Sequence, residues 1–146
     1  MAIKDTAKFY EKNRYVLIKS FIPPQLASFI YHYAHIRKAR AATMANSKWP
    51  DYREDVDGTF TDAQVPGTYS CYSDPMMETL LLQGLDGMKK ITGLNLAPTY
   101  SYWRLYKTGD VLKRHKDRPS CEVSTTLCLG YNNENLKGKK KHRQLY

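Results

Sequence analysis

The sequence predicts an α+β fold in which helices come first and consecutive strands follow. Two observations predict it. Apolar residues in the first two thirds of the chain recur at helical spacing between proline and glycine breaks, whereas from Pro98 onward the period changes to two. The chain has 146 residues, enough for one domain with its own core. We therefore expect a β-sheet core backed by helices, rather than alternating strands and helices.

The first predicted elements are a strand and a long helix. Residues Tyr15–Ile22 are rich in β-branched and aromatic side chains and end at two prolines, which indicates a strand. Proline also suits the first turn of a helix. A helix to about Ala41 is predicted by apolar residues at i, i+3, i+4 and i+7, namely Leu26, Phe29, Ile30 and Tyr33.

The middle of the chain predicts a loop and a second helix. Residues 43–72 have an acidic stretch and no clear period, which indicates a long loop with a short strand near Thr68–Tyr72. Asp74 followed by Pro75 is typical of a helix N-cap and first position. The apolar stripe that follows stops at Thr92-Gly93, a plausible C-terminal stop.

The last third predicts strands. These are Thr99–Lys107, an extended segment Val111–Asp117 and Glu122–Tyr131. One face of the first strand carries three phenols and a guanidinium: Tyr100, Tyr102, Arg104 and Tyr106. A cavity with an anionic ligand would give these polar groups partners, and a solvated sheet face is the alternative.

Several function classes are excluded by composition. No apolar run approaches the length of a membrane span, and no apolar segment typical of a signal peptide follows Met1. The cysteines are three and form no CxxC pair, which argues against a disulfide framework or a zinc knuckle. We therefore expect a cytoplasmic protein with no membrane partner.

The net charge of +9 suggests a nucleic-acid partner, but its distribution argues against one. Five basic residues and no acidic residue lie within 137–146, which we expect to be a disordered basic tail. Twelve tyrosines would suit stacking of unpaired bases, yet no RNP-like or OB-like motif accompanies them. A non-catalytic basic and aromatic binding module remains the alternative to an enzyme.

His115 and Asp117 are the candidate metal ligands. Residues two apart on an extended chain share a face, so an imidazole and a carboxylate converge there. One nitrogen and one oxygen are two thirds of the 2-His-1-carboxylate triad that holds non-haem Fe(II) and leaves positions open for a co-substrate and oxygen.

The segment from Pro98 to Asn132 resembles the core of an Fe(II)/2-oxoglutarate-dependent oxygenase, closest to the prolyl-4-hydroxylase-like branch. In that branch a strand with an R-x-Y-like pattern leads through a glycine turn into H-x-D, and a threonine-rich strand follows. The matching motifs are Arg104-Leu105-Tyr106, Gly109-Asp110, His115-Lys116-Asp117 and Val123–Leu129.

The resemblance implies a partial double-stranded β-helix, or jelly roll, over residues 1–136, with supporting N-terminal helices. It implies that His115 and Asp117 are catalytic Fe(II) ligands, that Tyr106 hydrogen-bonds 2-oxoglutarate, and that Thr126 lines the same pocket. The implied reaction is oxidative decarboxylation of 2-oxoglutarate coupled to hydroxylation of a C–H bond, and ascorbate is an allowed accessory cofactor. The substrate is a protein or small molecule of unknown identity, with peptidyl proline suggested only by the branch.

Two anchors of the family pattern are missing. The pattern needs a second histidine on a late strand and then an arginine or lysine for the distal carboxylate of 2-oxoglutarate. His142 is the only later histidine, and it lies in the basic tail. Too few residues follow Asp117 to complete an eight-stranded roll. We therefore expect a truncated chain that is inactive or impaired as written. One hypothesis is that residues up to about Lys137 are native and that the remainder is a frameshifted tail.

Overall fold

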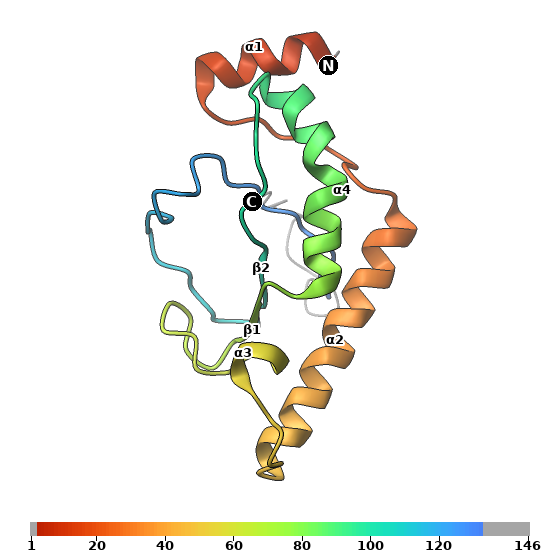
Figure 1. Ribbon diagram of the computed structural model, residues 1–146, viewed down its shortest axis with the longest axis vertical. Coiled ribbons are helices and arrows are strands. Elements are labelled where there is room, and N and C mark those ends of the chain that lie inside the picture. Colours follow the sequence, from red (N-terminus) through yellow and green to blue (C-terminus); the bar gives the residue numbers. More distant parts are fainter. Residues whose placement is uncertain (1–2, 133–146) are drawn as a thin grey trace, which may run out of the picture.

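The computed structural model describes residues 3–132 and combines helices with a small antiparallel sheet (Figure 1). This confirms the α+β class. The elements are α1 (Ile3–Asn13), α2 (Pro24–Asn46), α3 (Glu54–Asp57), β1 (Tyr69–Tyr72), α4 (Pro75–Thr92) and β2 (Tyr102–Leu105). The predicted basic tail at 137–146, including His142, lies outside the described residues.

The helix ends follow local sequence signals. The Asp74 side chain accepts a hydrogen bond from the Met76 backbone N at 3.0 Å, which confirms the predicted N-cap of α4. Gly93 ends this helix in the left-handed region, at a φ of 73°. The α2 helix runs beyond the predicted end near Ala41, because the alanine- and methionine-containing sequence up to Asn46 has no helix breaker.

The two strands pair antiparallel, with Tyr69 opposite Leu105 and Tyr72 opposite Tyr102. This register decides which side chains share a face. The Tyr69 ring is buried and lies edge-on to Trp103, with ring centroids 5.4 Å apart. Tyr72 and Tyr102 point to the other face and stay partly exposed. The sheet therefore has one face in the core, and its other face is exposed only at this end, because Ser70 is buried and the Arg104 side chain is 10% exposed.

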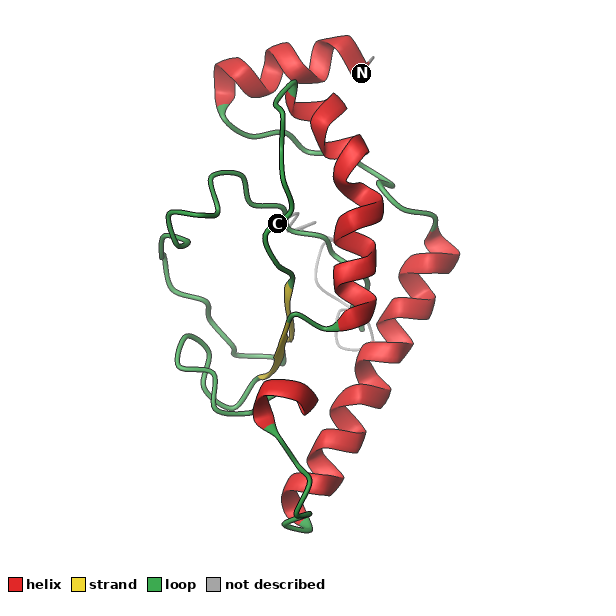
Figure 2. Cartoon of the chain, viewed as in Figure 1, coloured by secondary structure: helices red, strands yellow, loops and turns green. Residues whose placement is uncertain are grey.

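Three predicted extended segments are irregular in this structure. Tyr15–Ile22, Val111–Asp117 and Glu122–Tyr131 have no strand assignment and run as loops (Figure 2). Their composition suits strands, but a strand also needs a partner for its backbone groups. Within residues 3–132 the ladder joins only β1 and β2, with one isolated bridge between Thr59 and Ser70. A sheet of two strands is common to many folds, so the jelly roll stays a prediction.

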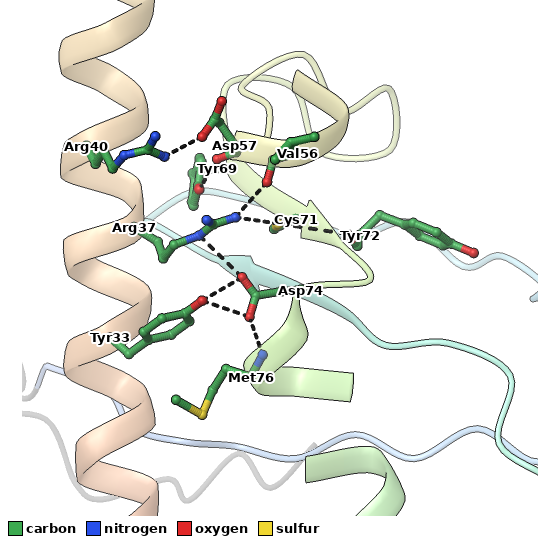
Figure 3. A network of polar contacts seen from close by, with 10 residues as sticks. All are labelled: Tyr33, Arg37, Arg40, Val56, Asp57, Tyr69, Cys71, Tyr72, Asp74 and Met76. Atoms are coloured by element: carbon green, nitrogen blue, oxygen red, sulfur yellow. Dashed lines mark hydrogen bonds and ion pairs between the residues drawn. The ribbon is translucent and has the colours of Figure 1, made fainter. Parts of the chain in front are cut away.

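A buried polar network joins α2 to the start of α4 (Figure 3). The Asp74 carboxylate lies 3.3 Å from Nε of Arg37 and accepts a hydrogen bond from the Tyr33 hydroxyl at 2.9 Å. Nη2 of Arg37 also donates to the Val56 carbonyl at 2.7 Å. Burial, and next the hydrogen bond to Asp74, raise the pKa of Tyr33 to about 12, so its hydroxyl remains a donor at ordinary pH.

The α1 helix packs against α4 at the other end of the molecule (Figure 1). Ala7 of α1 meets Gly93, where an added Cβ would lie 3.3 Å from the alanine methyl. None of the helices described here combines the length and apolar character that a bilayer crossing requires.

Replacing Asp74 with alanine should strongly destabilise the fold. The change removes the α4 N-cap and leaves the largely buried Arg37 guanidinium without its carboxylate. Breaking such a pair costs about 3–5 kcal/mol in the free energy of unfolding, which urea denaturation would measure.

The matched control is Asp86→Ala, which removes an exposed carboxylate from the middle of the same helix and should change stability by less than about 0.5 kcal/mol. Asp74→Asn keeps a side-chain oxygen for the cap and should lose less than Asp74→Ala. Equal stability of Asp74→Ala and the control would contradict the role of this network.

Candidate metal centre

The His115 and Asp117 side chains converge, as the sequence predicts. Nε2 of His115 lies 3.6 Å from Oδ1 of Asp117, and the two side chains are 37% and 42% exposed. Nδ1 of His115 lies 2.9 Å from the Lys113 carbonyl oxygen. Because a carbonyl can only accept, Nδ1 carries the hydrogen in this contact. In the neutral ring the lone pair is then on Nε2, the atom that faces Asp117.

Asp117 is held in a similar way by its second oxygen. The Ser124 hydroxyl donates a hydrogen bond to Oδ2 of Asp117. Oδ1 therefore faces His115 while Oδ2 is engaged. Metal ligands in proteins are commonly oriented by such outer hydrogen bonds, which fix the ring tautomer and the carboxylate rotamer. Sequence reasoning missed Ser124, because no spacing marks it as a partner of Asp117.

The pair is suited to hold one cation with two ligands. Two atoms 3.6 Å apart can each lie about 2.1 Å from a single ion, the usual nitrogen and oxygen distance for a divalent metal. The part of the chain that the structure describes contains no group of three or more His, Cys, Asp or Glu side chains able to hold a metal ion. The donor set found here is thus one nitrogen and one oxygen.

Asp110 anchors the turn that leads toward His115. Its carboxylate accepts hydrogen bonds from the Lys107 backbone N at 2.9 Å, from Lys107 Nζ at 2.6 Å and from the Thr68 hydroxyl. These bonds, led by the one from the Lys107 backbone, hold the pKa of Asp110 at about 2. The predicted Gly109-Asp110 turn is therefore tied to the residue before β1, across a long stretch of sequence.

Tyr106 and Thr126, the residues predicted to contact 2-oxoglutarate, are both accessible to solvent. Tyr106 is 52% exposed, and Thr126 is also exposed. Burial lowers the pKa of Arg104, but the hydrogen bond from its guanidinium to Asp62 helps to raise it overall. Among the contacts of the described residues, none joins Tyr106 or Thr126 to the histidine or the aspartate. Their roles toward 2-oxoglutarate remain predictions.

The guanidinium on the polar face of β2 has a carboxylate partner from the protein itself. Nε of Arg104 lies 2.5 Å from Oδ2 of Asp62, which also accepts a hydrogen bond from the Tyr102 hydroxyl at 2.9 Å. Burial alone would raise the pKa of Asp62, yet the bonds led by Arg104 hold it below its usual value. Asp62 lies in the loop without clear period, and no sequence signal links it to β2.

Comparison of the chain with protein-family models, with curated proteins and with solved structures gives no match. The geometry above and the motifs of the sequence are therefore the grounds for a functional proposal.

The Asp110 anchor predicts an acid-dependent stability difference. In the unfolded chain this carboxyl has an ordinary pKa of 3.8, whereas in the folded protein it is about 2. The ionised group therefore stabilises the fold above pH 4, and this contribution is lost as the pH falls from about 4 to about 2.

Wild-type protein should be more stable than Asp110→Asn at pH 5, and the difference should shrink as the pH approaches 2. Urea denaturation at several pH values measures it, and Asp86→Asn controls for the general loss of one carboxylate. A wild-type advantage that stays constant down to pH 2 would refute the anchor.

Proposed function

We propose that this protein is an Fe(II)- and 2-oxoglutarate-dependent oxygenase of prolyl-4-hydroxylase-like type, in which His115 and Asp117 hold the iron. The observation that carries the proposal is the convergence of Nε2 and Oδ1 to 3.6 Å, in the H-x-D motif that the resemblance assigns to iron. In this proposal the two-stranded sheet is part of a jelly roll.

The two residues are suitable ligands for a ferrous ion, both in their chemical type and in the way that hydrogen bonds orient them. The Lys113 carbonyl holds His115 in the tautomer with a free lone pair on Nε2, and the Ser124 hydroxyl holds the carboxylate. A single anionic ligand lowers the charge of the bound ion without saturating its coordination positions. When bound, Fe(II) would supply the oxygen chemistry that couples decarboxylation of 2-oxoglutarate to C–H hydroxylation.

Tyr106 and Thr126 are the proposed contacts for 2-oxoglutarate. The half-exposed Tyr106 phenol is accessible to a ligand and can donate a hydrogen bond to a carboxylate. Lysine and arginine side chains of the adjoining loop, Lys113, Arg114 and Lys116, favour the approach of a dianion. The substrate to be hydroxylated is a protein or small molecule, and ascorbate would serve as an accessory reductant.

Metal binding and turnover should both depend on His115. The wild-type chain should bind Fe(II), measured by calorimetry under anaerobic conditions, and form succinate from 2-oxoglutarate. His115→Ala and Asp117→Ala should each abolish both signals, since each removes one of two ligands. His35→Ala, which removes an exposed histidine from α2, should leave both unchanged. Equal Fe(II) binding by His115→Ala and wild type would refute the site.

Ser124 provides a finer test of the pair. Ser124→Ala removes the hydroxyl that orients Asp117 but no proposed ligand, so Fe(II) affinity should fall about tenfold to a hundredfold. Ser120→Ala, an exposed serine of the same loop region, is the matched control and should retain wild-type affinity. Identical affinities of the two variants would show that Asp117 does not need this bond.

A further inference from the structure

Three tyrosines lie close together where β1 ends and β2 begins, Tyr72 and Tyr102 from the two strands and Tyr100 from the residues just before β2. We call Tyr72, Tyr100 and Tyr102 the tyrosine row. The ring of Tyr72 lies with its centroid 4.8 Å from that of Tyr100 and 6.5 Å from that of Tyr102. The guanidinium carbon of Arg118 lies 4.4 Å from the Tyr100 centroid. The ring planes of these two pairs are tilted by 33° and 57°, so the row is a cluster of aromatic rings in contact, with a planar cation at one end.

This surface is accessible. Tyr72 and Tyr102 are 46% and 40% exposed, and Arg118 is exposed. The cation at the other end, Arg104, is neutralised by Asp62. Arg118 has no ion pair with any residue of the described region, so its charge remains available above the rings. Exposed aromatic rings and guanidinium planes are surfaces on which unpaired bases stack.

The segment that leads to Arg118 is basic. Residues 107–118 carry five lysine or arginine side chains, Lys107, Lys113, Arg114, Lys116 and Arg118. Its two acidic residues are engaged: Asp110 by Lys107 and Thr68, and Asp117 by Ser124 and His115. Positive charge is thus in excess on the segment that ends at Arg118, which favours a polyanion over a neutral peptide.

We propose that the tyrosine row with Arg118 binds single-stranded nucleic acid. A base stacks on the outer face of the Arg118 guanidinium and further bases lie against the exposed tyrosine rings, while the neighbouring lysines meet phosphates. A duplex binds more weakly, because its bases already stack on one another. A proline-rich peptide also binds to tyrosine rings, but it carries no phosphates to pair with the lysine and arginine side chains of 107–118.

The tyrosine row and Arg118 include neither of the proposed metal ligands, so the surface does not depend on the metal pair. Binding of single-stranded nucleic acid needs neither metal nor 2-oxoglutarate. Failure of the oxygenase proposal would therefore not contradict this one, and failure of this one would not contradict the oxygenase proposal.

The test uses fluorescence anisotropy of the full chain, without added metal, with a labelled oligo(dT) of about 12 nucleotides. Arg118→Ala should weaken binding about tenfold, since stacking and one phosphate contact are both lost, and should lower the salt slope by about 1. Arg118→Lys keeps the positive charge but removes the planar guanidinium group. It should therefore retain the salt dependence of the affinity and bind the oligonucleotide with intermediate affinity. Within residues 3–132 the exposed Arg118 side chain makes no hydrogen bond or ion pair, so both variants should fold.

Lys12→Ala removes one exposed charge from α1 and is the matched control, with affinity expected within about twofold of wild type. The charges of 137–146 are the same in every variant, so differences between variants report on Arg118. Equal binding by wild type and Arg118→Ala would overturn the proposal. So would equal affinity for the duplex, or binding of a proline-rich peptide with none of the oligonucleotide.

Discussion

The buried carboxylate of Asp74 is the constraint on which the rest of the structure depends. It caps α4, pairs with Arg37 and accepts the Tyr33 hydroxyl, so one side chain joins the long α2 helix to the end of β1. Burying a charge is costly unless the geometry is complete. The position of α2 relative to the sheet is therefore narrowly defined, and the sheet in turn carries the loops with the chemical groups.

The candidate metal pair is on a loop, and long-range polar contacts hold that loop in place. Thr68 fixes the turn at Asp110 and Ser124 fixes Asp117. Functional groups on loops are common when a rigid scaffold positions them.

The elements predicted well are those set by signals within a few residues. The Asp74-Pro75 start and the Gly93 end of α4 follow from capping chemistry, which acts over one helical turn. The strand predicted near Thr68–Tyr72 is confirmed as β1. The strand predicted at Glu122–Tyr131 is irregular, because β-rich composition cannot supply a partner strand.

The sequence by itself determined the α2 and α4 helices, the α+β class and the closeness of His115 to Asp117, since a spacing of two places these two residues within reach of each other. The α1 and α3 helices were not predicted from the sequence. Tertiary structure alone decided that Ser124 orients Asp117, that Asp62 neutralises Arg104 and that the Tyr72 ring contacts the Tyr100 ring. These contacts join residues whose separation in sequence follows no period. The packing of the chain sets the distances between these residues in space, and no local sequence pattern encodes that packing.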